Sequence, residues 1–203
     1  MIWIDNVLVS CGEGGVYGER LLKECRVWDP YRSKLAAFYY LCSTPDLTHD
    51  MRVLYLGAAN GTTVSHVADY VECVYAVEMA PRPIQDLLAV AGRRGNVIPI
   101  MADARRVESF APLLEVVDLI YQDVAQPDQV AIAIRNSIFL RRGGTLIIVL
   151  KTRSISVAEE PEIILQQANR ELECAGFDVT GSVWLKPYHK DHAVLVCSRV
   201  PGG

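Results

Sequence analysis

Two patterns of apolar and polar residues alternate along most of this chain, from Met51 onward. Short apolar runs of strand length are followed by longer stretches in which apolar residues recur every three or four positions, as on one face of a helix. This alternation predicts a parallel sheet with helices on both faces. We expect strands at Arg52–Leu56, Cys73–Val77, Asn96–Ile100, Val117–Gln122 and Gly144–Leu150, and helices near Thr63–Val71, Arg82–Arg93, Ala111–Leu114, Gln126–Phe139 and Glu160–Ala175.

The end of the chain departs from this alternation. Two strand patterns, Phe177–Leu185 and His192–Arg199, follow one another across the short connection Lys186–Lys190. A connection this short implies an antiparallel hairpin. The predicted fold class is therefore α/β, with a Rossmann-like, seven-stranded and mostly parallel sheet that ends in a C-terminal antiparallel hairpin. Such a sheet is typical of class I methyltransferases that use S-adenosylmethionine, whereas dehydrogenase sheets lack the hairpin.

The first 27 residues predict a small β region. Strand patterns at Ile2–Ile4 and Val7–Val9 flank the turn-prone pair Asp5-Asn6, and the glycines at 12, 14 and 15 interrupt the pattern. This segment is too short to bury a core of its own. We expect it to pack on the main domain, which comprises residues 28–203.

A helix is expected within Trp28–Leu41, at the start of the main domain. Asp29 is predicted as its N-cap and Pro30 as its first helical residue, a pairing that favours helix starts. This places Lys34 on a helix close to the sheet. The turn-forming residues Ser43–Asp50 are expected to form a linker to the first strand.

The composition is that of a soluble globular protein, with 203 residues, 51% hydrophobic and 22% charged. The apolar runs are well below the roughly 20 residues of a membrane span, and the N-terminus does not resemble a signal peptide. We therefore expect a cytoplasmic protein without membrane contact. The net charge of −4 is unlike that of proteins that grip nucleic acid unaided. If RNA is the substrate, other molecules must help to bring it.

The six cysteines and four histidines are scattered along the chain. No two cysteines have CxxC spacing, and several lie in apolar strand patterns. We therefore expect reduced core thiols rather than disulfides. The scatter of the histidines likewise predicts no metal site.

A glycine-containing turn joins the first strand of the main domain to the next helix. Gly57 and Gly61 permit close backbone approach, and the helix N-terminus offers free N–H groups. A dinucleotide fingerprint would need glycine at Ala59 and Thr62. The loop therefore favours a nucleoside ligand without a pyrophosphate, such as S-adenosylmethionine.

Carboxylates follow the next strands at the same edge of the predicted sheet. Glu78 comes about 20 positions after Gly57, the spacing at which a carboxylate accepts hydrogen bonds from ribose hydroxyls; a solvated strand-end glutamate is the structural alternative. Asp103 is placed to accept from an adenine amino group, although Arg105 is equally able to pair with it. Asp123 follows the fourth strand. Because parallel strands bring their carboxyl ends to one edge, we expect these residues to surround one ligand.

Taken together, these segments resemble the fibrillarin family. The similarity covers residues 16–199, and its motifs occur in the family's order: Trp28–Ala37, Leu54–Val67, Tyr75–Glu78, Asp103–Arg105, Asp123–Gln129 and Pro187–Ala193. The chain departs from the family at Asn60, where serine is usual, and at Met79, where an aromatic residue is usual. Its N-terminal domain is abbreviated, and it lacks the Gly/Arg-rich arm of eukaryotic members, which indicates an archaeal-type, cytoplasmic rather than nucleolar protein.

The resemblance implies the cofactor S-adenosyl-L-methionine and methylation of ribose 2′-hydroxyls in rRNA or tRNA. It also implies a box C/D guide RNA, a Nop-domain scaffold protein and a kink-turn-binding protein as partners. The cofactor-binding residues expected from it and from the strand ends are Gly57, Ala58, Ala59, Gly61, Thr62, Thr63, Glu78, Met79, Asp103, Ala104, Asp123, Val124, Ala125 and Gln126.

Removing the weakly acidic proton of a 2′-hydroxyl needs a base, and a lysine serves when burial or a nearby cation lowers its pKa. Lys151, at the end of an apolar strand, is the candidate base, as the resemblance also implies. Lys34 would supply the neighbouring charge, and Asp123 would orient the lysine or the methyl group. Asp191 or His192 would complete the set, because both follow the hairpin turn Lys186–Lys190. Since side chains alternate along a strand, we expect only one of the two to face the cleft, and the sequence does not decide which. A snorkelling lysine at the strand end is the structural alternative.

Two other functions stay open at this level. One is a methyltransferase that acts on a protein side chain or a small molecule. The other is a non-catalytic assembly subunit of the same particle, which the departures at Asn60 and Met79 would allow.

Overall fold

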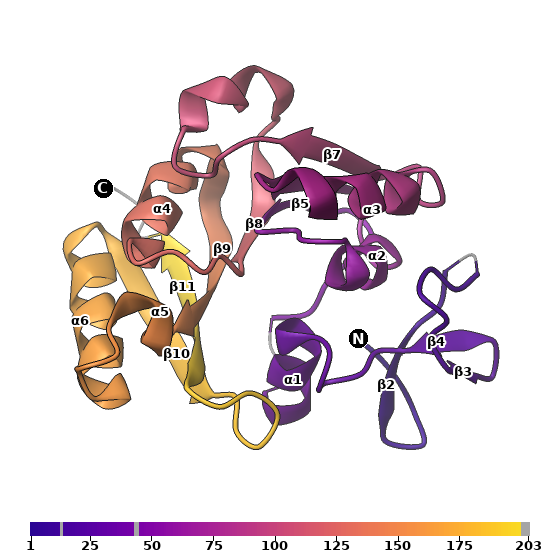
Figure 1. Ribbon diagram of the computed structural model, residues 1–203, viewed down its shortest axis with the longest axis horizontal. Coiled ribbons are helices and arrows are strands. Elements are labelled where there is room, and N and C mark those ends of the chain that lie inside the picture. Colours follow the sequence, from indigo (N-terminus) through magenta and orange to yellow (C-terminus); the bar gives the residue numbers. More distant parts are fainter. Residues whose placement is uncertain (13, 43–44, 200–203) are drawn as a thin grey trace.

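The computed structural model describes residues 1–12, 14–42 and 45–199. Two sheets organise them: a four-stranded sheet near the N-terminus and a seven-stranded sheet that forms the body of the molecule (Figure 1). The four-stranded sheet lies within the predicted β region 1–27. Of the expected linker Ser43–Asp50, residues 43–44 lie outside the described residues.

The seven-stranded sheet has the strand order β10-β11-β9-β8-β5-β6-β7. Strands β5 to β9 run parallel, whereas β11 is antiparallel to both β9 and β10. The α/β class and the C-terminal antiparallel hairpin are therefore confirmed. The strands are β5 (Arg52–Leu56), β6 (Cys73–Glu78), β7 (Val97–Met101), β8 (Val117–Gln122), β9 (Leu140–Lys151), β10 (Phe177–Trp184) and β11 (His192–Arg199).

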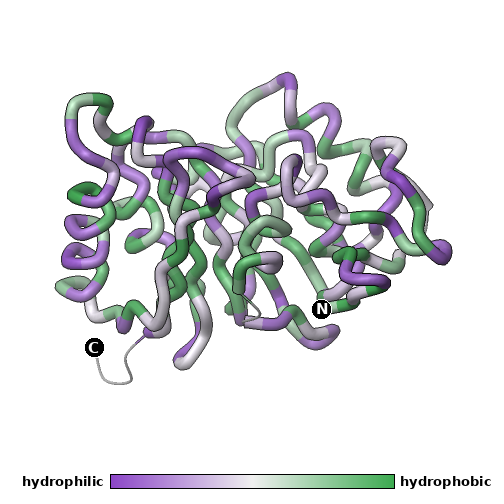
Figure 2. The backbone as a smooth tube through the Cα atoms, turned by 90° about the horizontal axis from the view of Figure 1, so that it is seen from below, coloured by the Kyte–Doolittle hydropathy of each residue, from purple (hydrophilic) through white to green (hydrophobic). Residues whose placement is uncertain are grey.

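Helices cover both faces of this sheet. Successive side chains of β5 point to opposite faces, and those of residues 53–56 are all buried, so both faces must be covered. Val53 and Tyr55 face a core shared with α1, α2 and α3, whereas Leu54 and Leu56 face a core shared with α4 and α6. Figure 2 shows the hydrophobic strand segments in the middle of the molecule and many of the hydrophilic turns at its periphery. The helices are α1 (Lys34–Leu41), α2 (Thr62–Ala68), α3 (Pro81–Ala91), α4 (Gln129–Asn136), the short α5 (Thr152–Ile155) and α6 (Pro161–Cys174).

Several predicted elements have other bounds or another type. The strand expected from Gly144 already begins at Leu140. The helix expected at Ala111–Leu114 is a single 3-10 turn, η2 (Ala111–Leu113), with Pro112 in its first turn. The helix expected from Gln126 begins only at Gln129, because residues 123–126 run along the cavity described below. It ends in a 3-10 turn, η3 (Ser137–Phe139), and a further one, η1 (Val107–Ser109), precedes η2.

The start of α1 differs from the prediction. Asp29 is not its N-cap: the Asp29 carboxylate accepts from the Tyr31 N–H, and its carbonyl accepts from the N–H of Arg32 and Ser33. These bonds close a turn, so the helix begins later. Ser33 caps it by accepting from the Ala36 N–H at 3.2 Å. Lys34 is nevertheless on the helix, as predicted.

The N-terminal sheet has the order β1-β2-β4-β3, with β1 (Ile2–Ile4), β2 (Val7–Ser10), β3 (Leu21–Leu22) and β4 (Cys25–Val27). The Asp5-Asn6 turn is confirmed, since both residues have positive φ. The expectation of reduced cysteines is wrong for one pair, because Cys11 and Cys25 form a disulfide. Antiparallel pairing of Ser10 with Arg26 places these two cysteines opposite each other, which sequence spacing alone does not reveal.

A buried ionic network attaches the N-terminal sheet to α2. The fully buried Arg26 guanidinium pairs with Glu19 at 2.8 Å and with Asp69 at 2.6 Å. Asp69 also accepts from Arg94 at 2.8 Å. Burial acts to raise the pKa of Glu19, but backbone N–H donors and the Arg26 charge outweigh it and lower that pKa to about 2. The sheet therefore docks through paired charges in addition to apolar packing.

Among the described residues, no helix has the length and apolar character needed to cross a bilayer.

Candidate active site

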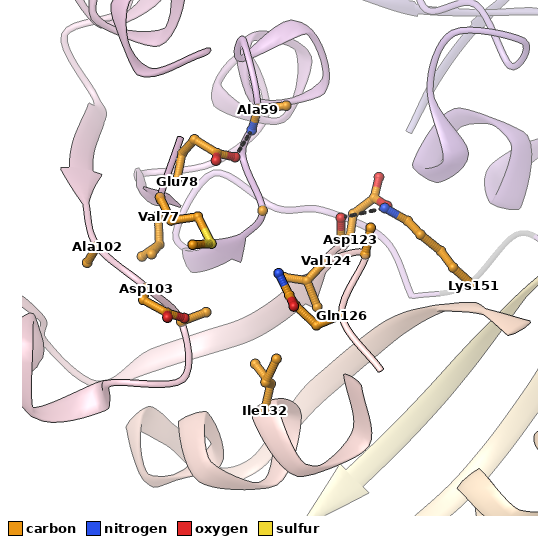
Figure 3. A pocket seen from close by; sticks show the side chains of 14 residues that line it. Ala59, Val77, Glu78, Ala102, Asp103, Asp123, Val124, Gln126, Ile132 and Lys151 are labelled. Carbon is orange, nitrogen blue, oxygen red and sulfur yellow. Dashed lines mark hydrogen bonds and ion pairs between the residues drawn. The ribbon is translucent and has the colours of Figure 1, made fainter. Parts of the chain in front are cut away.

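A cavity of about 250 Å³ opens at the carboxyl edge of the parallel strands, where the strand patterns predicted a ligand. Its walls come from the ends of β5, β6, β7, β8 and β9 and from α4. Most of the predicted cofactor residues line it (Figure 3). The lining residues are Gly57, Ala59, Val77, Glu78, Met79, Ala102, Asp103, Ala104, Asp123, Val124, Ala125, Gln126, Ile132 and Lys151.

Gly57 lets two strand ends come together at the cavity. It has φ +82°, and a Cβ there would lie 2.8 Å from the Asp123 carbonyl oxygen. The Gly57 N–H donates to the Val77 carbonyl at 3.0 Å, and the Asp123 N–H donates to the Leu56 carbonyl at 2.9 Å. Because Gly57 has no side chain, the ends of β5, β6 and β8 can approach one another closely and form one rim of the cavity.

Glu78 holds the cofactor loop through its backbone. One carboxylate oxygen accepts from the Ala59 N–H at 2.8 Å and the other from the Ala80 N–H at 2.8 Å (Figure 3). Ala59 has φ +49°, so this bond also secures a left-handed residue. Each oxygen keeps a further lone pair. Glu78 is thus positioned to accept from a ligand's hydroxyls while it fixes the loop.

Four of the predicted cofactor residues do not line this cavity. Ala58 is buried beneath the loop. Gly61 packs on α3, where a Cβ would lie 2.9 Å from the Leu87 side chain. Thr62 donates to the Asn60 side chain at 3.1 Å, and Thr63 donates to the Ser33 hydroxyl at 3.0 Å. These four residues lie outside the cavity lining, and their contacts help to fix the conformation of the loop.

Sequence reasoning missed three lining residues. Val77 and Ala102 directly precede the predicted Glu78 and Asp103, so strand-end position was the available signal. Ile132 comes from α4, and its apolar character gives no signal that distinguishes it from core.

Asp103 lines the cavity and also pairs with Arg105, at 2.7 Å. Hydrogen bonds from the Arg105 side chain lower the pKa of Asp103. The geometry is thus compatible with Asp103 as an acceptor for an adenine amino group and also with Asp103 as an ion-pair partner of Arg105. Met79, the residue that departs from the family pattern, lines the cavity with 46% of its surface exposed.

Two lysines from distant parts of the chain share the Asp123 carboxylate. Lys34 Nζ, on α1, lies 3.1 Å from Oδ2, and Lys151 Nζ, at the end of β9, lies 2.7 Å from Oδ1. Lys151 Nζ also donates to the Asp123 carbonyl at 2.8 Å (Figure 3). All three side chains are mostly buried, with exposed fractions of 22%, 14% and 15% for Lys34, Asp123 and Lys151. The structure therefore brings this predicted trio together, and Asp123 and Lys151 line the cavity.

The fully buried Gln129 holds Lys151 in place. Its Oε1 accepts from the Lys151 N–H at 2.9 Å, and its Nε2 donates to the Lys151 carbonyl at 3.2 Å. Gln122 Nε2 in turn donates to the Gln129 carbonyl at 2.8 Å. Gln129 belongs to the segment that resembles a family motif, yet only the fold reveals that it fixes the end of β9.

The structure separates Asp191 from His192. His192 pairs directly with Lys151 across β11 and β9, so the two side chains share a face. Burial lowers the pKa of His192, and the charges of Lys34 and Lys151 lower it further. The hydrogen bond to the Lys190 carbonyl and the charge of Asp123 act in the opposite direction but do not outweigh them. Asp191 instead has a positive φ and directs its carboxylate to Arg153, at 3.6 Å. His192 is therefore the member of the pair that lies with the two lysines.

Across the described ranges, no group of three or more His, Cys, Asp and Glu side chains is arranged to hold a metal ion.

The sheet order and the cavity at its carboxyl edge define a Rossmann-like fold of the class used by S-adenosylmethionine-dependent methyltransferases. Solved structures agree with this fold. A fibrillarin structure determined in complex with Nop5p has a TM-score of 0.93 at 40% identity and covers 98% of this chain and 96% of that chain. Aeropyrum pernix fibrillarin with natively bound S-adenosyl-L-methionine has a TM-score of 0.81 at 41% identity, with 92% and 85% covered.

Sequence comparison agrees. The fibrillarin family model matches residues 7–200. A fibrillarin-like rRNA/tRNA 2′-O-methyltransferase from Methanoculleus marisnigri is 65% identical over 199 residues, which cover 98% of this chain and 99% of the relative. One from Methanosarcina mazei is 48% identical over 187 residues, with 87% and 82% covered. The chain belongs to the fibrillarin family, which confirms the resemblance found in its sequence.

Proposed function

We propose that this protein transfers a methyl group from S-adenosyl-L-methionine to the ribose 2′-hydroxyl of rRNA or tRNA, as the catalytic subunit of a box C/D guide-RNA particle. The observation that carries the proposal is the Asp123 carboxylate, held between Lys34 and Lys151 at the mouth of a cavity fit for a nucleoside. Relatives across nearly the whole chain bear the name rRNA/tRNA 2′-O-methyltransferase.

The cavity residues fit S-adenosylmethionine. Gly57 leaves the rim open where a Cβ would collide with Asp123, so a ligand can lie close to the backbone. Glu78 offers carboxylate lone pairs for the ribose hydroxyls, and Asp103 offers them for an amino group. Val77 and Ile132 supply apolar walls for a flat base. When bound, the cofactor supplies an electrophilic methyl group on its sulfonium.

The catalytic residues act on the hydroxyl that attacks this methyl group. Lys151 takes the proton of the 2′-hydroxyl while the hydroxyl oxygen bonds to the methyl carbon and the bond from that carbon to sulfur breaks, leaving a neutral thioether. Asp123 orients Lys151 through its carboxylate and its carbonyl, and Lys34 fixes the same carboxylate from the other side. His192, on the face of Lys151, is placed to accept a hydrogen bond from the hydroxyl. We assign Asp191 the role of fixing the hairpin turn, through Arg153 and Thr152.

The net charge of −4 supports the participation of other RNA-binding partners. We propose a Nop-domain scaffold, a kink-turn-binding protein and a box C/D guide RNA, with the guide selecting the target nucleotide. The fibrillarin of similar fold was solved with Nop5p, which supports the scaffold. We also propose a cytoplasmic location, in keeping with the archaeal-type sequence.

Reconstitution tests this function. The chain is combined with labelled S-adenosylmethionine, guide RNA, a complementary target RNA, the scaffold and the kink-turn-binding protein, and label in the target is mapped by nuclease digestion. We expect a single 2′-O-methylated nucleotide that moves when the guide sequence is changed. Label at the same level in RNA lacking a guide would contradict the proposal.

Two controls separate the alternative functions. Cofactor binding without transfer by the complete particle would indicate an assembly subunit. Label in a partner protein or in a small molecule, but not in RNA, would indicate another substrate class.

A further inference from the structure

A second cavity lies outside the site described above. It has a volume of about 340 Å³ and sits between the N-terminal sheet and the starts of α1 and α2. Its walls include residues within or next to these three elements: Arg20, Trp28, Arg32, Ser33, Thr62 and His66. None of the residue roles assigned above uses this space.

The rim of this cavity carries positive charge. Arg20 and Arg32 are both exposed, and neither forms an ion pair with any residue that the structure describes. Two carboxylates also line the cavity. Glu19 is neutralised by the buried Arg26, and Asp29 is engaged by the backbone of its own turn. Two uncommitted guanidinium groups therefore remain, an arrangement that favours phosphate or carboxylate ligands.

The start of α1 adds to this preference. Ser33, the N-cap of the eight-residue α1, lines the cavity. Helix N-termini bear partial positive charge and unpaired N–H groups, which favour anions.

The inner wall is uncharged and aromatic. Ser10 donates to the Asp69 carboxylate at 2.6 Å, so it accepts from His66 Nδ1 at 2.7 Å. Burial, with the charge of Arg26, lowers the pKa of His66 to about 3, which keeps its ring neutral. This ring stacks on Trp28 with 5.1 Å between centroids. An anion is thus expected at the arginine rim, not at the inner wall.

One residue of the cavity wall is next to the Lys34–Asp123–Lys151 trio in the sequence. Ser33 directly precedes Lys34, and its hydroxyl bonds both Trp28 Nε1, at 2.9 Å, and Thr63, at 3.0 Å. We propose that this cavity binds a backbone phosphate of the target RNA strand. This phosphate belongs to a nucleotide near, in the RNA sequence, the one whose ribose is held at Asp123. This inference rests on the proposed function and adds a positioning site, formed by Arg20 and Arg32, that registers the strand.

Kinetics of the complete particle test the inference. Arg20→Gln and Arg32→Gln are assayed singly and together, with Arg170→Gln as a matched control on the exposed face of α6, far from this cavity (Figure 1). Each cavity variant is expected to raise KM for the target RNA about fivefold at about 0.1 M salt, with kcat and cofactor affinity unchanged. The slope of log(kcat/KM) against log[salt] is expected to become shallower by about 0.7–0.9 in the double variant, because one phosphate contact is lost. Arg32→Lys should restore most of that slope.

The outcomes are distinguishable from failure of the function itself. If the wild-type particle methylates its target but the Gln variants keep the wild-type KM and salt slope, the inference is wrong. Reduced binding of the scaffold protein by the Gln variants, measured by calorimetry without RNA, would also overturn it and indicate a protein carboxylate as the occupant. An equal effect of Arg170→Gln would show a general charge effect instead of a site.

Discussion

Replacing Gly57 by alanine tests whether the rim of the cofactor cavity depends on close backbone contact. Two costs are expected. An alanine at φ +82° is strained by about 1–2 kcal/mol. Its Cβ would also meet the Asp123 carbonyl at 2.8 Å, and overpacking of this kind costs about 1–3 kcal/mol. The carbonyl that must move is the one that accepts from Lys151, so the displacement reaches the Lys34–Asp123–Lys151 trio.

Gly143→Ala is the matched control. Gly143 has φ +69°, but a Cβ there meets nothing within 4 Å, so this variant carries the conformational cost alone. At about 2–4 °C per kcal/mol for a chain of this size, we expect Tm to fall by about 2–8 °C for Gly143→Ala and by about 4–20 °C for Gly57→Ala. Calorimetric titration should show cofactor Kd unchanged for Gly143→Ala and raised at least about tenfold for Gly57→Ala, if about 1.4 kcal/mol of the strain opposes binding. Equal Tm and equal cofactor Kd for the two variants would refute this reasoning.

Three further predictions concern single side chains. Lys151→Ala should reduce the rate of methyl transfer about 10²-fold or more, with cofactor Kd nearly unchanged. An equal loss of transfer rate and cofactor affinity would show that Lys151 holds the fold or the cofactor instead. His192→Asn should reduce kcat by more than tenfold, about 1.4 kcal/mol, whereas Asp191→Asn should reduce it less; the reverse order in a single-turnover assay would contradict the assignment of His192. The lowered pKa of the buried His66 means that the unfolded chain binds one more proton below about pH 6.5. Stability from this group is therefore present above that pH and is lost as the pH falls toward 3, by up to about 1.4 kcal/mol per unit. Denaturant titrations from pH 7 to pH 4 should show this slope in the wild type and a shallower one in His66→Gln; identical slopes would count against it.

The sheet and most of the cofactor cavity follow from the sequence for a simple physical reason. Buried parallel strands need continuous apolar runs, and their carboxyl ends meet at one edge, so Gly57, Glu78, Asp103 and Asp123 could be assigned to one site before the fold was known. Lys151 is predicted in the same way, from its position at the end of a strand.

What the sequence did not reveal depends on pairing between distant segments. The Cys11–Cys25 disulfide requires the register of β2 against β4, and the choice of His192 over Asp191 requires the register of β11 against β9. Gln129 looks like any polar residue in a first helical turn until the fold places it against the end of β9. The start of α1 differs from the prediction because Asp29 and Ser33 are both good N-caps, and the hydrogen bonds that Asp29 makes within its own turn leave Ser33 as the cap.

The two hydrogen bonds that the Glu78 carboxylate accepts affect the rate and the affinity with which a nucleoside binds. Because the Ala59 and Ala80 N–H groups already bond its two oxygens, the turn around Ala59 is held in one conformation before any ligand arrives. A ligand therefore meets an ordered receptor, and little of its binding free energy is spent on arranging the loop. Shortening this side chain by Glu78→Asp would return that ordering cost to the binding step, so association would slow even where the final contacts could still form.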